Sequence, residues 1–136
     1  MNFFVLDASV WVARLVPQDE FHEAVKSWMA EQRTAEIQFV SPSLLLAEVA
    51  GAISRRTGSA VLGHKAAREL EALQGLRLVE MNKVLLLEAA TLAADLGLRG
   101  ADSVYVATAK RLGVPLVTFD VDQRERAKNQ IAIHNI

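Results

Sequence analysis

Short, uninterrupted apolar runs alternate along this chain with longer segments in which apolar residues recur at helical spacing. The two clearest runs, Asn2–Leu6 and Val114–Phe119, are rich in β-branched and aromatic residues, and each ends directly before an aspartate. Continuous runs of this length are typical of parallel strands that are buried on both faces. We therefore predict strands at both runs, and shorter strands at Glu36–Val40, Arg77–Glu80 and Ile131–Ile133.

The segments between these runs carry helix start and stop signals. Asn82 is suited to cap a helix that continues to Leu96 and ends at Gly97. Ser41-Pro42 offers a cap residue followed by proline at the first helical position, and Asp19 is a second candidate cap. The other helices are expected at about Ser9–Leu15, Asp19–Gln32, Ser41–Arg56, Ser59–Leu73, Ala101–Leu112 and Asp122–Lys128.

Strands that alternate with helices favour an α/β architecture. Because crossovers between parallel strands are right-handed, the helices should cover both faces of the sheet. We therefore expect a three-layer α/β/α sandwich with a mostly parallel central sheet. A length of 136 residues without a linker or a repeat indicates a single domain over residues 1–136.

Composition narrows the classes of function. The chain has 15 lysine and arginine residues against 16 acidic residues, so nucleic-acid binding would depend on a local patch or on metal ions. The absence of cysteine excludes a disulfide framework, a thiolate zinc site and a cysteine nucleophile. The N-terminus lacks the basic region of a signal peptide, and no apolar run is long enough for a membrane span. We expect a soluble, cytoplasmic protein.

Four acidic residues lie within unusually apolar surroundings. They are Asp7, Glu48, Asp102 and Asp120, and no lysine or arginine occupies a matching position in their runs. A buried carboxylate is costly unless it is paired, hydrogen-bonded or bound to a cation. Carboxylate oxygens without neighbouring histidine or thiol groups suit Mg²⁺ or Mn²⁺. Such ions activate water and stabilise the leaving oxygen in phosphodiester cleavage, so an acidic metal site is one interpretation.

Each of three acids also has a purely structural interpretation. Asp7 and Asp120 are suited to cap the helices that follow them, a role in which aspartate is favoured. Asp102 is suited to the first turn of a helix, opposite the positive end of the helix dipole. The spacing of the acids along the chain does not decide whether they converge on one site.

Glu48 stands in the middle of a predicted helix, where a capping role does not apply. Its neighbours in the sequence LLLAEVAG are apolar, which sets it apart from an ordinary solvated glutamate. The structural alternative for this residue is a partly buried salt bridge to Arg14 or Arg55.

Four segments in the same order resemble the PIN-domain ribonucleases, and most of all their VapC-type toxins. The segments are LDASV after the first strand, a helical LLLAEV, LRGADSVYVATA, and PLVTFDVDQ. No single motif is specific to the family. Four motifs in this order, over essentially the whole chain, are a fairly strong signal. Ser103 stands where alanine is commoner in the family, and no acid of the pattern is missing.

The resemblance implies a catalytic site for Mg²⁺ or Mn²⁺ formed by Asp7, Glu48, Asp102 and Asp120. It implies that Ser9 and Thr118 orient carboxylates, and that Asp122 is an additional candidate ligand. It further implies metal-dependent cleavage of RNA, a partner antitoxin that blocks the site, and a homodimer. Two alternatives remain: a free-standing RNA-processing nuclease, and a catalytically silent PIN-like module that binds a partner.

Overall fold

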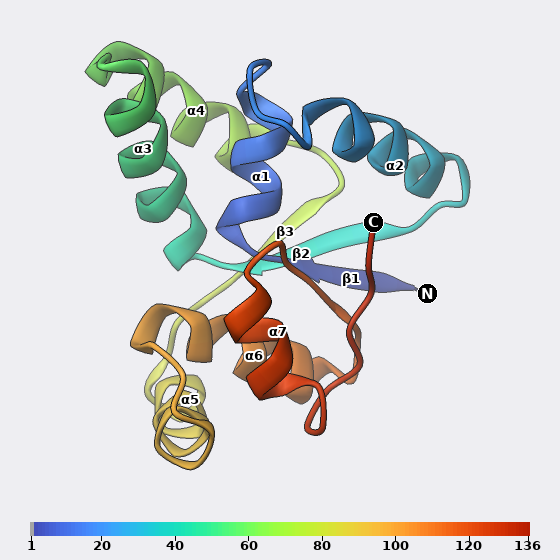
Figure 1. Ribbon diagram of the computed structural model, residues 1–136, viewed down its shortest axis with the longest axis vertical. Coiled ribbons are helices and arrows are strands. Elements are labelled where there is room, and N and C mark those ends of the chain that lie inside the picture. Colours follow the sequence, from blue (N-terminus) through green and yellow to red (C-terminus); the bar gives the residue numbers. More distant parts are fainter. Residues whose placement is uncertain (1) are drawn as a thin grey trace.

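Four parallel strands form the centre of the computed structural model, which describes residues 2–136 (Figure 1). They are β1 (Phe3–Leu6), β2 (Gln38–Pro42), β3 (Leu76–Val79) and β4 (Leu116–Val117), in the order β3-β2-β1-β4. Val5 pairs with Val40 on one side and with Leu116 on the other, so β1 is a central strand. All four strands therefore end at the same edge of the sheet.

Helices cover both faces of this sheet (Figure 1). One face carries α1 (Ala8–Leu15), α2 (His22–Thr34), α3 (Leu44–Thr57) and α4 (Ala60–Ala72). The other carries α5 (Lys83–Leu96), α6 (Gly100–Leu112) and α7 (Val121–Ala127). The expected three-layer α/β/α sandwich is confirmed.

Two apolar clusters separate the layers because successive strand residues point to opposite faces. Leu6 packs into the cluster under α1–α4, while its neighbour Val5 packs into the cluster under α5–α7. Trp11 and Trp28 are both buried in the first cluster and lie against the ring of Phe39. A strand with both faces buried in this way reads as a continuous apolar run, which is why β1 is recognisable from sequence.

Several predicted helix ends are confirmed at the level of single residues. The Asn82 side chain accepts a hydrogen bond from the Leu85 amide at 2.9 Å, and α5 ends at Gly97 in the left-handed conformation, with φ of 68°. The Ser59 hydroxyl likewise accepts from the Leu62 amide at the start of α4. These local signals act between residues of the same helix end, so they can be recognised from the sequence.

Two predicted caps are wrong. Ser41 and Pro42 lie in β2, paired with β3, and α3 begins only at Leu44. The Ser41 hydroxyl instead donates to the Leu6 carbonyl at 2.6 Å, so it joins β2 to β1. Asp19 precedes α2, which begins at His22, and its carboxylate binds the Phe21 amide in a turn. Strand pairing thus takes Ser41 away from the start of a helix, and a turn does the same for Asp19.

The C-terminal strands are shorter than predicted. Within Val114–Phe119 only Leu116 and Val117 form the ladder, and of Ile131–Ile133 only Ile133 makes a bridge, to Leu116. After Val117 the backbone amides bond to side chains instead: the Phe119 amide donates to the Ser9 hydroxyl and the Asp120 amide to the Thr118 hydroxyl. Over residues 2–136, no helix has the length and apolar character needed to span a membrane.

Candidate functional site at the ends of strands β1 and β4

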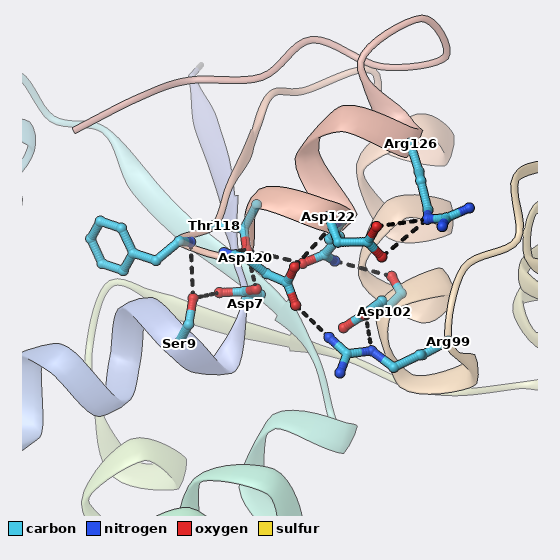
Figure 2. Close-up of polar contacts among 10 residues, drawn as sticks. Asp7, Ser9, Arg99, Asp102, Thr118, Asp120, Asp122 and Arg126 are labelled. Atoms are coloured by element: carbon cyan, nitrogen blue, oxygen red, sulfur yellow. Dashed lines mark hydrogen bonds and ion pairs between the residues drawn. The ribbon is translucent and has the colours of Figure 1, made fainter.

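Asp7 follows β1 directly and is almost fully buried, with 5% of its surface exposed. Its Oδ1 accepts the Ser9 hydroxyl at 2.5 Å and, more weakly, the Val10 amide at 3.4 Å, which makes it the N-cap of α1. Its Oδ2 lies against the Thr118 hydroxyl at the end of β4 (Figure 2). Two segments more than one hundred residues apart in the chain therefore meet at one carboxylate.

Burial raises the pKa of Asp7 from 3.8 to about 6, and the negative charge of Asp102 adds to this rise. The hydrogen bonds from Ser9 and Thr118 act in the opposite direction. Thr118 Oγ1 faces Gln123 Oε1, at 2.9 Å, as well as Asp7. A hydroxyl carries one proton, so both acceptors are satisfied together only when Asp7 is itself protonated. Burial therefore leaves Asp7 with a carboxyl group that takes up a proton more readily than an exposed aspartate.

Asp120 uses its two carboxylate oxygens for different tasks. Oδ1 accepts from the Gln123 amide at 3.0 Å and caps α7, while Oδ2 accepts from Nη2 of Arg99. The capping interpretation therefore holds for both Asp7 and Asp120, and it does not compete with a role in a site. A cap needs one oxygen and leaves the other free to face a second group.

Asp102 lies in the first turn of α6, and its Oδ2 accepts from Nε of Arg99 at 3.0 Å. Partial burial raises the pKa of Asp102, and the charges of Asp120 and Asp122 raise it further, while Arg99 lowers it. The Arg99 guanidinium thus lies between Asp102 and Asp120 and binds both (Figure 2). These acids share one electrostatic environment although Asp102 lies at the start of α6 and Asp120 follows β4, the next element of the chain.

Glu48 reaches this environment from the other face of the sheet. Its Oε1 accepts a hydrogen bond from the Tyr105 hydroxyl at 2.5 Å. In residues 2–136 the ion pairs of the structure do not include one between Glu48 and Arg14 or Arg55, so the salt-bridge alternative is wrong. Burial raises the pKa of Tyr105 strongly, and Glu48, Asp7 and Asp102 all contribute to the rise. Three of the four predicted acids are therefore close enough to the phenol for their charges to raise its pKa.

The acids do not close around one point as arranged here. Among residues 2–136, no group of three or more histidine, aspartate or glutamate side chains is close enough to hold a metal ion. Asp122 is exposed and forms a bidentate pair with Arg126, at 2.9 and 3.0 Å. The donor chemistry nevertheless suits Mg²⁺ or Mn²⁺, since Asp7, Asp102 and Asp120 offer only oxygen ligands. The charge of Asp102 raises the pKa of Asp7, and the charge of Asp120 raises the pKa of Asp102.

A cleft of about 530 Å³ has Glu48 in its wall, whereas Asp7, Asp102 and Asp120 are not among its lining residues. Ser9 and Glu48 line it, together with Phe21 and Phe119, whose rings stack at 4.3 Å. The Phe119 amide donates to the Ser9 hydroxyl at 3.0 Å, so the wall of the cleft is fixed to the group that binds Asp7. Glu48 and the Asp7 network therefore border the same space.

Sequence reasoning missed Gln123 and Tyr105. Gln123 is fully buried; its Oε1 faces the Thr118 hydroxyl, and its Nε2 donates to the Asp102 carbonyl at 3.3 Å. The spacing Asp120-x-x-Gln123 resembles a capping box and was an available signal. Tyr105 stands one helical turn after Asp102, so its place on the same side of α6 could also have been found.

Comparison with solved structures finds the same fold at low sequence identity. The VapC20 toxin of Mycobacterium tuberculosis, which cleaves the sarcin-ricin loop, is 19% identical; 90% of this chain and 93% of that one superpose with a TM-score of 0.77. DNA-bound VapBC from Salmonella typhimurium is 15% identical, with 99% and 98% coverage and a TM-score of 0.73. FitAcB from Neisseria gonorrhoeae is 20% identical, with 97% and 96% coverage and a TM-score of 0.68.

A comparison with curated proteins found no matching relative. The sequence does match a family model, and the match covers nearly the whole chain. It extends over residues 4–129, so it includes all four predicted acids, the two hydroxyl residues that bind Asp7, and Arg99. By this match and by its three-layer fold, the chain belongs to the PIN domain family.

Proposed function

We propose that this protein is a Mg²⁺- or Mn²⁺-dependent endoribonuclease that acts as the toxin of a toxin–antitoxin pair. The observation that carries this proposal is that Asp7 follows β1, Asp120 follows β4 and Asp102 lies in the first turn of α6, where Asp102 raises the pKa of Asp7 and Asp120 raises that of Asp102. Glu48 is hydrogen-bonded to Tyr105, whose pKa responds to Asp7 and Asp102 as well. Membership of the PIN domain family supports a nuclease. The structural likeness to the VapC20 toxin supports the toxin role.

In this proposal Asp7, Glu48, Asp102 and Asp120 hold the divalent cation, and Asp122 is an auxiliary ligand. When bound, the cation supplies positive charge that activates water and stabilises the developing charge on the RNA phosphate. Ser9 and Thr118 orient the Asp7 carboxylate through their hydroxyl groups. The net charge of −1 is then no obstacle to RNA binding, because the cation offsets the acids at the point of contact.

The proposed partners follow from the same site. A cognate antitoxin would block it most simply by presenting an arginine or lysine to the carboxylates, since these groups already accept a guanidinium from Arg99. We propose that the protein is cytoplasmic, that residues 1–136 form one nuclease domain, and that it acts as a homodimer. A free-standing processing nuclease would share the chemistry but need no antitoxin, and a silent module would need neither metal nor RNA.

RNA cleavage by purified protein tests the nuclease. Cleavage should require Mg²⁺ or Mn²⁺ and stop with EDTA, and Asp102→Asn should lower its rate at least about 100-fold because a ligand charge is lost. Asp95→Asn is the matched control, since it removes an exposed carboxylate from α5. Cleavage that continues in EDTA, with contaminating nuclease excluded, would contradict the proposal.

Growth assays test the toxin role separately. Induced expression should stop growth, Asp102→Asn should abolish that effect, and co-expression of an adjacent short gene should restore growth. Normal growth at verified expression, together with metal-dependent cleavage in vitro, would favour the processing nuclease instead.

A further inference from the structure

Arg99 binds two of the proposed metal-holding carboxylates at once. It is the N-cap residue of α6, and its Nε donates to Oδ2 of Asp102 at 3.0 Å while its Nη2 donates to Oδ2 of Asp120 (Figure 2). These oxygens belong to acids that the proposed function assigns to a divalent cation. A guanidinium and a cation that need the same oxygens oppose each other's binding.

The Arg99 contacts are easily exchanged, in contrast to those of Asp7. The Arg99 side chain is 72% exposed, and ion pairs of exposed side chains contribute little to stability. Asp7 is instead held by hydroxyl groups inside the protein. The site therefore combines a fixed carboxylate with two carboxylates whose present partner can move away at low cost.

A displaced Arg99 would remain beside the acids, because its backbone is fixed at the start of α6. Its recorded hydrogen bonds use Nε and Nη2, which leaves Nη1 for a further acceptor. The planar guanidinium matches the geometry of a phosphate group, and it stays charged at all relevant pH values. A phosphate brought to the carboxylates by a cation would thus lie within the reach of this side chain.

We propose that Arg99 is an exchangeable counter-ion of the acidic site: it competes with the divalent cation for Asp102 and Asp120 and, once displaced, binds a phosphate of the RNA substrate. This inference rests on the proposed function. It makes Arg99 a substrate-binding residue that also lowers the metal affinity of the site. Loss of its charge should therefore strengthen metal binding and weaken RNA binding.

Calorimetric titration with Mn²⁺ alone tests the competition without RNA. Arg99→Gln should bind Mn²⁺ about three- to tenfold more tightly than wild type, because the competing ion pairs are gone. Arg99→Lys keeps the charge but lacks the paired donors of the guanidinium, so its Mn²⁺ affinity should lie between those of wild type and Arg99→Gln. Arg68→Gln removes an exposed arginine from α4, and this control should bind Mn²⁺ like wild type.

RNA cleavage at saturating Mn²⁺ tests the phosphate contact. Arg99→Gln should raise KM about tenfold with a much smaller change in kcat, and Arg99→Lys should recover part of the loss. Circular dichroism melts establish that each variant is folded, and Arg99→Lys carries the test if Arg99→Gln is not.

The outcomes separate this inference from the proposed function. Wild-type protein that neither binds Mn²⁺ nor cleaves RNA would contradict the proposed function itself. Wild-type protein that binds Mn²⁺ while Arg99→Gln binds it equally or more weakly would overturn the competition. Tighter Mn²⁺ binding with an unchanged KM would overturn the phosphate contact.

Discussion

The Tyr105 hydroxyl donates a hydrogen bond to Oε1 of Glu48 at 2.5 Å, and this contact joins helices from opposite faces of the sheet. Tyr105 belongs to α6 and is 1% exposed, whereas Glu48 belongs to α3 and is half-buried. A glutamate in mid-helix thus gains a fixed orientation from a group that is remote in the chain. The contact places the Glu48 carboxylate against a phenol whose pKa is also raised by the charges of Asp7 and Asp102.

Removal of that hydroxyl should impair function more than stability. Tyr105→Phe leaves the packing of the ring intact but leaves Glu48 without its donor, so kcat/KM for RNA cleavage should fall about tenfold or more. The free energy of unfolding should fall by only about 1 kcal/mol, since one hydrogen bond is lost and Glu48 retains access to water. Steady-state kinetics and urea unfolding measure the two effects.

Thr108→Val is the matched control for Tyr105→Phe. It also removes a buried hydroxyl from α6, but Thr108 donates only to the Val104 carbonyl of its own helix, at 2.7 Å. We expect a similar small loss of stability and unchanged cleavage. Equal loss of activity in both variants would mean that Tyr105 acts through the helix rather than through Glu48.

Gln123→Met should destabilise the protein by about 1–3 kcal/mol, because the Asp102 carbonyl and the Thr118 hydroxyl lose a partner in the interior. Methionine has a similar size, so cavity formation contributes little. Gln130→Met removes an exposed glutamine that binds Lys110, and it should change stability by less than about 0.5 kcal/mol. Urea unfolding compares the variants, and equal stability would show that the buried amide is not needed.

Thr118→Val should remove the donor to Asp7 at nearly constant side-chain shape. We expect a loss of about 2 kcal/mol in the free energy of unfolding near neutral pH, where the acceptor is a carboxylate. The same change should raise the pKa of Asp7 beyond its present value, because the Thr118 bond lowers it. Thr118→Ser retains the hydroxyl, so its stability and the pKa of Asp7 should both lie close to those of wild type. If they do not, the effect of Thr118→Val is due to packing.

The raised pKa of Asp7 predicts a definite pH dependence. The pKa is about 6 in the folded protein against 3.8 as the ordinary value, so between these pH values the folded state binds more protons than the unfolded state. Wild-type protein should therefore lose stability as pH rises from about 4 to about 6, and lose little more above that range. Relative to wild type, Asp7→Asn should gain about 2 kcal/mol between pH 4 and pH 7.

Urea unfolding as a function of pH measures this divergence. The stability of Asp95→Asn, which changes an exposed carboxylate on α5, should vary with pH as that of wild type does. Parallel curves for wild type and Asp7→Asn would show that Asp7 is not a proton-binding group of the native state.

Mn²⁺ at a hundredfold excess over Kd should raise the free energy of unfolding of wild type by about 2.7 kcal/mol, and that of Asp7→Asn by less.

Sequence by itself determined the layers of this fold and the position of its acids along the chain. The apolar runs that end at Asp7 and Asp120 became β1 and β4, and the cap at Asn82 lies where its local signal indicated. These features depend on burial patterns and on backbone groups within a few residues of each other. Such interactions are encoded in adjacent positions, so they can be recognised without knowledge of the distant chain.

Tertiary structure alone decided which polar groups meet. Ser41 lies in β2 rather than at the start of a helix because β3 pairs with β2. The contacts of Arg99 with Asp120 and of Tyr105 with Glu48 span segments that no periodicity relates. The partner of a polar side chain depends on which elements pack against its own, and that information resides in the assembled layers rather than in any one segment of the sequence.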